Sequence, residues 1–124
     1  KDMIIRSGLK VYPARVEEIL RRCAGVLDVA VFGRPDLLHS EVVAAAVVTA
    51  PDTDFTELKS RLIESARHHL APYEVPTAFE RIAEIPRTPL GKVQKNILRD
   101  GLLAGGLARR DLPTEEPSQA KEVT

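Results

Sequence analysis

The feature of the sequence that most constrains its fold is an uninterrupted run of small apolar residues at positions 42–48. The run lacks the alternation of apolar and polar residues that is typical of a strand with one face in water. The simplest interpretation is a strand covered on both faces, although periodicity alone also allows a buried segment of helix. Pro51 ends the run, which is far too short to span a lipid bilayer.

An amphipathic helix is predicted before this run. Pro13 suits its first turn, because the missing N–H is not needed there, and Gly25 closes it. Four apolar residues fall on one face, namely Val16, Ile19, Leu20 and Cys23. On the solvent face, two acidic residues precede two arginines by four positions, an order that favours ion pairs: Glu17 and Glu18 before Arg21 and Arg22.

A second amphipathic helix is predicted after the run. Asp54 and Glu57 fit the N-cap and N3 positions of a variant capping box. Apolar residues then recur every four positions, at Leu58, Leu62, Ala66 and Leu70. The acidic residues at the start of this helix are therefore interpreted as caps rather than as catalytic carboxylates.

The remaining segments complete a small sheet. In chain order, we expect a hairpin at residues 3–12 with its turn at Gly8, a strand at 27–32, a turn at 33–36, a third strand at 78–82 and a short helix at 94–100. Residues 101–124 are small and polar, so we expect disorder there. Residues 1–100 are thus predicted to form an α+β domain with helices packed on a small mixed sheet, a fold that identifies no function by itself.

The composition removes several classes of function. Basic and acidic residues number 18 each, so the net charge of zero gives no argument for a general nucleic-acid or membrane-surface binder. With 4% aromatic residues and no tryptophan, no platform for stacking single-stranded nucleic acid is present. Cys23 is the single cysteine, so we expect no disulfide, no cysteine metal cluster and a reducing, cytoplasmic location. The histidines (His39, His68 and His69) lack metal-site spacing, so no metal site is expected.

The first residues of the chain are unusual for a natural start. The sequence begins with Lys1 and Asp2, and strand-like residues follow at once, without a signal-peptide pattern. We therefore expect a fragment of a longer protein.

The sharpest candidate for chemistry is Lys92, which ends the segment PRTPLGK at residues 86–92. Two prolines stiffen this loop and Gly91 permits close backbone approach, so one ammonium group is well presented to a phosphate or carboxylate. On loop composition alone, a solvated surface lysine is the favoured alternative. The segment is not a P-loop, because no second glycine stands five residues upstream of Gly91.

Three separate stretches of the sequence together carry a resemblance to a known family. The first reads KDMIIRSG at residues 1–8, followed by VYPA at 11–14 and VE at 16–17. The second reads HLAPYEVP at 69–76, and the third reads PRTPLGKVQK at 86–95 with LR at 98–99. Each stretch alone is a weak signal, but the ordered set spans residues 1–100. Together they resemble the C-terminal domain of the acyl-CoA synthetase, adenylation-domain and luciferase superfamily.

This resemblance implies the lid domain of an ATP-dependent acyl-CoA synthetase that acts on a fatty or other organic acid. In the family, a carboxylate attacks the α-phosphate of ATP, and a thiol, usually that of coenzyme A, then displaces AMP. A large N-terminal domain holds most of the acyl and ATP sites, together with the Mg²⁺ expected to accompany ATP. The lid rotates about a hinge between the two steps, so we expect the isolated chain to be inactive.

The same resemblance implies roles for particular residues. Lys92, supported by Gly91, would bridge the carboxylate and the α-phosphate in the first step, where a positioned ammonium stabilises the shifting charge. Lys1 and Asp2 match the hinge, which need only absorb a backbone rotation.

Further matches lie outside this loop and the hinge. Ser7 and Gly8 match the loop that swings in for thioester formation, where small residues let the pantetheine arm of CoA pass. Arg87 and Lys95 are candidates to meet phosphates of the nucleotide or CoA, although each is more often a solvated surface charge.

The sequence departs from the family pattern at two places. Arg15 stands where the family usually has Glu, and the expected glycine near Ser40 is missing. Two alternatives remain open: an adenylation domain that loads a separate carrier protein, and a non-catalytic α+β interaction module in which Lys92 is incidental.

Overall fold

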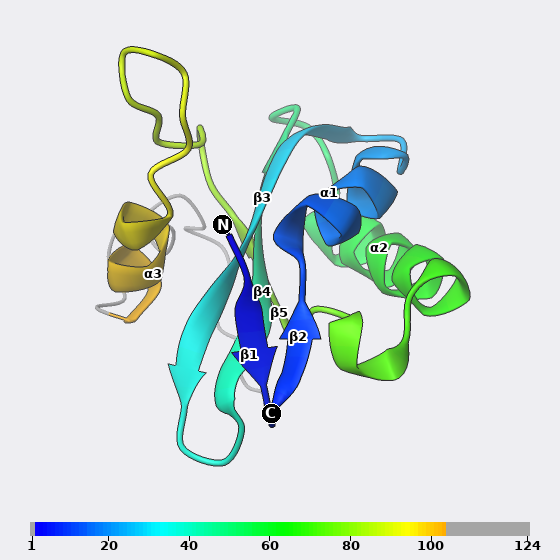
Figure 1. The fold of residues 1–124 in the computed structure, drawn as a ribbon. Coiled ribbons are helices and arrows are strands. Elements are labelled where there is room, and N and C mark those ends of the chain that lie inside the picture. Colours follow the sequence, from blue (N-terminus) through cyan, green and yellow to red (C-terminus); the bar gives the residue numbers. More distant parts are fainter. Residues whose placement is uncertain (1, 104–124) are drawn as a thin grey trace.

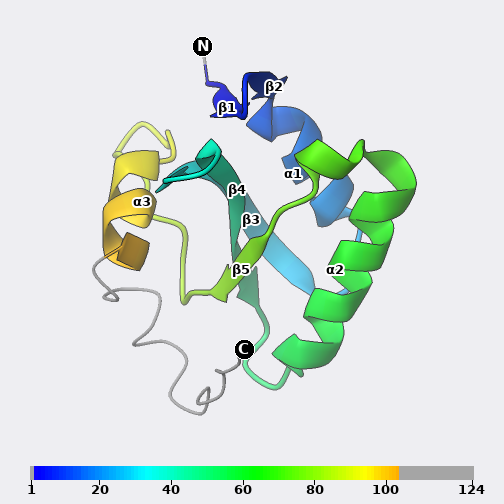
Figure 2. The ribbon, with the colours of Figure 1, turned by 90° about the horizontal axis from the view of Figure 1, so that it is seen from below.

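The structure, a computed structural model, describes residues 2–103, so the predicted hinge residue Lys1 and the tail from residue 104 onward lie outside the described residues. The elements in chain order are β1 (Ile4–Arg6), β2 (Leu9–Val11), α1 (Pro13–Arg21), β3 (Val26–Asp36), β4 (Ser40–Thr49), α2 (Phe55–His69), the 3₁₀ turn η1 (Pro72–Glu74), β5 (Ala78–Arg81) and α3 (Lys95–Leu103). They form three layers, with α1 and α2 on one face of the sheet and α3 on the other (Figure 1 and Figure 2).

The centre of the sheet is β4, which has neighbours on both sides. One side pairs antiparallel with β3 along most of its length. The other side pairs with β1 at Ser40 and, further along, in parallel with β5. Because antiparallel and parallel pairs share one sheet, the predicted mixed α+β fold is confirmed. No other described strand pairs with the outer edge of β3.

Both faces of β3 and β4 are buried, which explains the missing alternation in the sequence. In β3, Val29 and Val31 join the core beneath α1 and α2, whereas Ala30 and Phe32 join a second core beneath α3. In β4 the same alternation separates Val43, Ala45 and Val47 from Ala44 and Ala46. The apolar run is therefore a strand covered on both faces, and the alternative of a buried helix is wrong.

The two amphipathic helices form with their predicted apolar faces inward. Pro13 occupies the first turn of α1, and the Asp54 carboxylate accepts a hydrogen bond from the backbone N–H of Glu57 at 3.2 Å, which caps α2. The helical part of α1 ends at Arg21, earlier than predicted, and Gly25 lies in the following turn with φ = +102°. Cys23 is half-buried against the same core.

Other predicted boundaries also differ from the structure. The turn expected at residues 33–36 is strand, because β3 continues to Asp36 and the chain reverses just after it. In β3 the backbone N–H and C=O groups of Val29, Val31 and Gly33 point to the open edge of the sheet. Pro35 falls on the same side because strand residues alternate, so its missing N–H removes no hydrogen bond from the ladder with β4. The last helix extends to Leu103, beyond the predicted end at residue 100.

Candidate functional site

The segment that carries Lys92 is a closed loop rather than a free one. The backbone N–H of Gln94 donates to the Pro86 carbonyl at 2.9 Å, and Arg87 and Val93 form a β-bridge just inside it. Further out, Thr88 and Lys92 are joined by a backbone hydrogen bond of 2.8 Å. Paired backbone groups at the base thus hold the loop as a narrow projection from the sheet (Figure 1).

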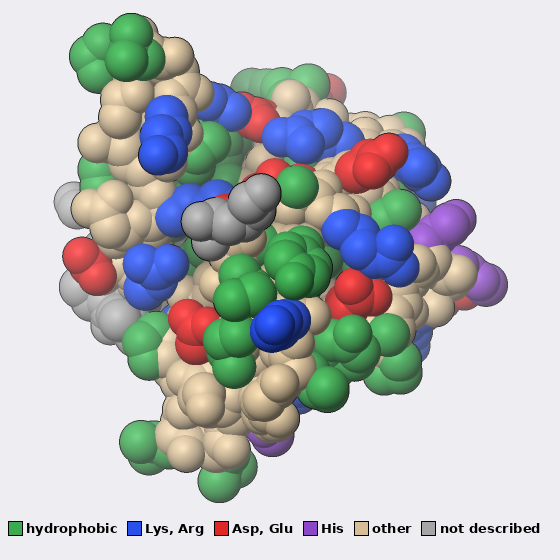
Figure 3. All heavy atoms as spheres, viewed as in Figure 1, with side chains coloured by type: hydrophobic (Ala, Val, Ile, Leu, Met, Phe, Trp, Pro, Cys, Tyr) green, Lys and Arg blue, Asp and Glu red, His purple; other side chains and the backbone are tan. Residues whose placement is uncertain are grey.

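Lys92 lies exposed near the tip of this projection. Its backbone N–H donates to the Thr88 Oγ at 3.2 Å, and Gly91 beside it has φ = +93°, a conformation that favours glycine. Within residues 2–103, the Lys92 ammonium makes no hydrogen bond or ion pair. The neighbouring Leu90 is 97% exposed, and Figure 3 shows hydrophobic side chains at the loop tip. The loop therefore presents an ammonium group that no acidic side chain among residues 2–103 pairs with.

The first end of the loop is anchored to β3 by Arg87. Its Nη1 lies 2.9 Å from the Oδ2 of Asp28, and this hydrogen bond raises the pKa of the Arg87 guanidinium. The other carboxylate oxygen of Asp28 accepts from the backbone N–H of Val29 at 2.8 Å. Arg87, one of the predicted phosphate contacts, is thus engaged by a carboxylate of this chain.

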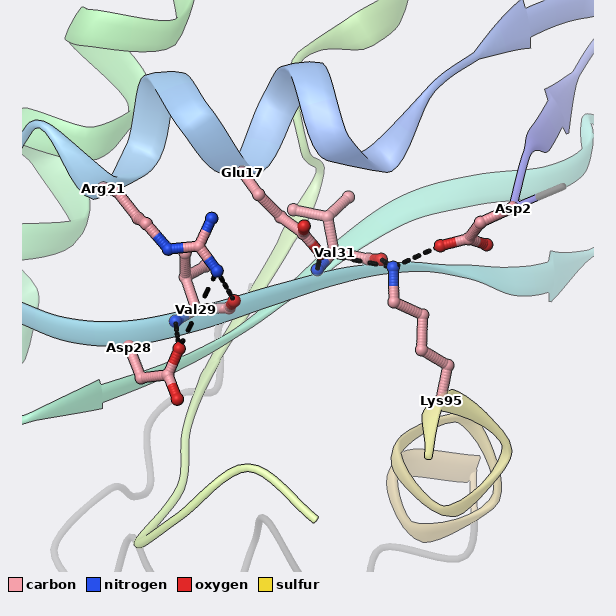
Figure 4. A network of polar contacts seen from close by, with 7 residues as sticks. All are labelled: Asp2, Glu17, Arg21, Asp28, Val29, Val31 and Lys95. Atoms are coloured by element: carbon pink, nitrogen blue, oxygen red, sulfur yellow. Dashed lines mark hydrogen bonds and ion pairs between the residues drawn. The ribbon is translucent and has the colours of Figure 1, made fainter. Parts of the chain in front are cut away.

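The second end of the loop is anchored by Lys95, at the start of α3 (Figure 4). Its Nζ lies 2.5 Å from the Asp2 Oδ2, 2.6 Å from the Val31 carbonyl and 3.2 Å from the Glu17 Oε2. A lysine ammonium has three donors, and here each has an oxygen partner. Lys95, the other predicted phosphate contact, is also engaged within the chain and is only 17% exposed.

These contacts belong to a row of charged side chains along the open edge of β3. Glu17 accepts from the backbone N–H of Val31 at 2.8 Å, and Arg99 donates to the Gly33 carbonyl at 2.8 Å. Arg21 donates to the Val29 carbonyl at 3.4 Å. Side chains of α1 and α3 thereby satisfy backbone groups that would otherwise offer a template for another strand.

This row corrects one prediction about α1. Glu18 and Arg22 form the expected ion pair at 3.5 Å, but Glu17 and Arg21 each hydrogen-bond to β3 and not to each other. Spacing within a helix could not reveal this, because the competing partners belong to a strand farther along the chain. Glu17 and Asp28 are therefore supporting residues of the loop that sequence reasoning missed.

The second predicted loop, Ser7 and Gly8, is the turn between β1 and β2. Both residues have positive φ, +51° and +83°, and the space where a Gly8 side chain would begin is open. His39, from the turn between β3 and β4, holds this loop through two contacts. Its carbonyl accepts from the Ser7 N–H at 2.8 Å, and its Nδ1 lies 2.9 Å from the Ser7 Oγ.

The two candidate loops lie at opposite ends of the molecule. Figure 1 shows the loop of Lys92 beyond one end of the sheet and the turn of Ser7 and Gly8 at the other, beside the β3–β4 turn. The β3–β4 turn carries Leu37 and Leu38, which are 104% and 85% exposed, and Figure 3 shows hydrophobic side chains there. The structure therefore does not bring Lys92 and Ser7 into one site.

The departure at Arg15 also has a structural role. Arg15 Nε lies 3.0 Å from the Oε2 of Glu74, whose side chain is only 8% exposed. The other carboxylate oxygen of Glu74 accepts from the backbone N–H of Ala71 at 2.8 Å. Arg15 thus supplies a charge partner for a buried acid of η1.

Other features of the described residues bear on ligands and membranes. Residues 2–103 contain no cluster of three histidine, cysteine or acidic side chains placed to hold a metal ion. In the same range, no helix combines the length and apolar character that crossing a bilayer requires. A surface hollow of about 590 Å³ beside the end of α2 includes Arg67 and Pro72 and contains none of the candidate site residues.

The three-layer α+β domain and its anchored loop do not fix the class of protein by themselves, and the comparison with known families supplies it. Residues 15–92 match the family described as the AMP-binding enzyme C-terminal domain. The chain therefore belongs to the AMP-binding enzyme C-terminal domain family.

Several relatives of known name are acyl-CoA ligases. The chain is 43% identical over 100 residues to 3-[(3aS,4S,7aS)-7a-methyl-1,5-dioxo-octahydro-1H-inden-4-yl]propanoyl:CoA ligase of Mycobacterium tuberculosis. The matched region covers 81% of this chain and 19% of the relative. The chain is 40% identical, with the same coverage, to the long-chain-fatty-acid–CoA ligase FadD13 of that organism. The solved structure of a Mycobacterium tuberculosis fatty acyl CoA synthetase matches 85% of this chain and 20% of its own, with 38% identity and a TM-score of 0.75. The chain thus spans about a fifth of the length of the relatives it matches.

Proposed function

We propose that this chain is the lid of an ATP-dependent acid–CoA ligase and that Lys92 is its adenylation lysine. The observation that carries the proposal is the contrast between Lys92 and the two cations at the base of its loop. Arg87 and Lys95 are both paired with carboxylates, whereas the Lys92 ammonium has no partner among residues 2–103. The names of the acyl-CoA ligase relatives support the reaction class.

In the first step, an oxygen of the organic acid attacks the α-phosphorus of ATP, and the bond to pyrophosphate breaks. Lys92 bridges the attacking carboxylate and the α-phosphate, so its positive charge stabilises the charge that shifts between them. The closed loop keeps this ammonium in position before the reaction begins. Mg²⁺ bound with ATP, mainly by the N-terminal domain, would neutralise part of the negative charge on the phosphates.

In the second step, the thiol sulfur of CoA attacks the acyl carbonyl carbon, the bond to AMP breaks and the thiol proton is released. The turn of Ser7 and Gly8 serves this second step, because the open space beside Gly8 leaves room for the pantetheine arm of CoA. Lys1 and Asp2 form the hinge about which the lid changes orientation. The activity is located in the cytoplasm, and the acid is a fatty or related organic acid.

The proposal is tested in the full-length ligase that contains this lid. Lys92→Ala is compared with Lys59→Ala, which removes an exposed lysine of α2. We expect Lys92→Ala to slow carboxylate-dependent ATP–pyrophosphate exchange by on the order of a hundredfold or more. Thioester formation from pre-made acyl-adenylate should stay within about twofold of the Lys59→Ala value, because Lys92 acts only in the first step.

Other outcomes discriminate between the alternatives. Unchanged exchange in the Lys92→Ala enzyme would favour a non-catalytic interaction module. Normal exchange with a carrier protein accepted in place of free CoA would favour a carrier-loading adenylation enzyme. The isolated chain should release no pyrophosphate, since it spans only about a fifth of the length of its ligase relatives.

A further inference from the structure

The ammonium of Lys95 joins three parts of the chain that are far apart in sequence. Its contacts to Asp2, Glu17 and Val31 come from the N-terminal segment, α1 and β3, while Lys95 itself follows the loop of Lys92 by three residues. Figure 4 shows the side chain reaching from α3 to the edge of β3, between the two carboxylates. One side chain therefore fixes the base of the loop and the N-terminal segment to the same strand edge.

The burial and charge of this cluster argue against a ligand-binding role for Lys95. Its side chain is 17% exposed and that of Glu17 is 15% exposed, so both charges are largely removed from water. Glu17 and Asp2 together place two negative charges around one positive charge. With two carboxylates and a carbonyl as partners, the ammonium has no donor left for a phosphate, and a phosphate here would face both carboxylates.

We infer that Lys95 is a positioning residue, which fixes the N-terminal segment at Asp2 relative to the loop that carries Lys92. The inference rests on the proposed function and deepens it, because it names what sets the placement of Lys92 when the lid closes. Asp2 is the residue of the predicted hinge that the structure describes, so its contact with Lys95 relates the direction of the hinge to the direction of the loop. A displacement of about 1 Å at a reacting group can slow a reaction on the order of a hundredfold.

The experiment uses the full-length ligase with four variants. Lys95→Met removes the charge and keeps the length of the side chain, and Lys95→Arg keeps the charge and donors. Asp2→Asn removes the charge of one partner at a side chain that is 56% exposed, so folding is preserved. Lys59→Met is the matched control on the exposed surface of α2.

We expect Lys95→Met to lower kcat for ATP–pyrophosphate exchange by on the order of tenfold to a hundredfold, with KM for ATP within about twofold of the control. Thioester formation from pre-made acyl-adenylate should change by less than about twofold, because Lys92 takes no part in it. Asp2→Asn should also slow exchange while sparing thioester formation, with kcat for exchange lowered by roughly threefold to tenfold. Lys95→Arg should keep most of the exchange activity, because it retains the charge and the donors.

Three results would overturn the inference. One is that Lys95→Met and Asp2→Asn both behave like Lys59→Met. Another is a rise in KM for ATP at unchanged kcat, which would mark a phosphate contact. The third is an equal loss in both half-reactions with a lowered melting temperature, which would mark a purely structural residue. Lys92→Ala, measured alongside, reports on the proposed function separately: a collapse of exchange there with normal exchange in Lys95→Met refutes the inference alone.

Discussion

At Ser40 the backbone adopts φ = +70°, a left-handed conformation that residues with a side chain rarely hold. Ser40 lies near the position where the family resemblance implies a glycine, a residue that adopts this conformation without strain. Ser40 is exposed and pairs with Arg6 where β4 meets β1, so the strain lies where two hairpins join.

Replacing Ser40 with glycine should therefore stabilise the protein. Relief of the left-handed strain contributes about 1–2 kcal/mol, and the greater freedom of glycine in the unfolded chain offsets part of it, leaving a gain of about 1 kcal/mol. Chemical denaturation measures the change. Ser60→Gly, in the interior of α2, is the control and should lower stability by roughly half a kcal/mol. A loss of stability in Ser40→Gly would contradict the strain.

At Gly33 a side chain is disfavoured by lack of space rather than by backbone conformation. A methyl group added there would lie 2.6 Å from the Glu41 Oε2, while the Glu41 Oε1 accepts from the backbone N–H of Ile5 at 2.8 Å. Glu41 therefore links β1 to β4 while its carboxylate covers Gly33.

Gly33→Ala should push this carboxylate aside and destabilise the protein by about 1 kcal/mol, mainly because the hydrogen bond to the Ile5 N–H is lost. Glu41→Ala should also destabilise it, because the Ile5 N–H loses its acceptor. The double variant should be more stable than the sum of the two losses predicts, since the clash is then absent. Additive losses in a denaturation cycle would show that the two residues do not interact.

At the scale of the elements, the loop of Lys92 depends on the backbone conformation at Gly91. An alanine there meets no atom within 4 Å, so its effect comes only from φ = +93°. We expect Gly91→Ala to slow ATP–pyrophosphate exchange by on the order of tenfold, because the strained turn displaces Lys92. The melting temperature should change little, since the loop projects from the core. Exchange at the normal rate would show that the turn tolerates a side chain and that its geometry is not limiting.

The elements themselves were largely predictable from the sequence, for local reasons. The strand at residues 42–48, the cap at Asp54 and the stiff loop before Lys92 are encoded by neighbours in the chain. The end of β3 was not predictable, because Gly33 and Pro35 favour a turn unless β4 pairs beside them. Local sequence favours one structure there and the tertiary pairing imposes another.

The candidate site was predictable only in part, and the same distinction applies. Lys92 and Gly91 are recognisable because their motif is contiguous in the sequence. The partners of Lys95 are not, because they come from segments separated from it by 64 to 93 residues. Such contacts leave no periodicity or motif in a single sequence.

At the scale of the whole molecule, the two candidate loops should be separable by mutation. Gly8→Leu places a bulky side chain on the open side of the β1–β2 turn, and Gly8→Ala is the matched control that carries the same backbone strain. We expect Gly8→Leu to slow thioester formation on the order of tenfold more than Gly8→Ala, because its bulk obstructs the pantetheine arm. ATP–pyrophosphate exchange should be the same in both variants. Equal thioester rates in the two variants would contradict a role in thiol access.

The length of β4 sets how finely the lid must be oriented. Its ten residues, at a rise of roughly 3.3 Å each, span about 33 Å. The loop of Lys92 lies toward one end of the strand and the turn of Ser7 and Gly8 toward the other. A tilt of the domain by about 10° around the midpoint of β4 moves either end of the strand by about 3 Å, the length of one hydrogen bond. Under the proposed function, a docking error of about 10° would therefore be enough to move Lys92, or the turn of Ser7 and Gly8, out of reach of its target.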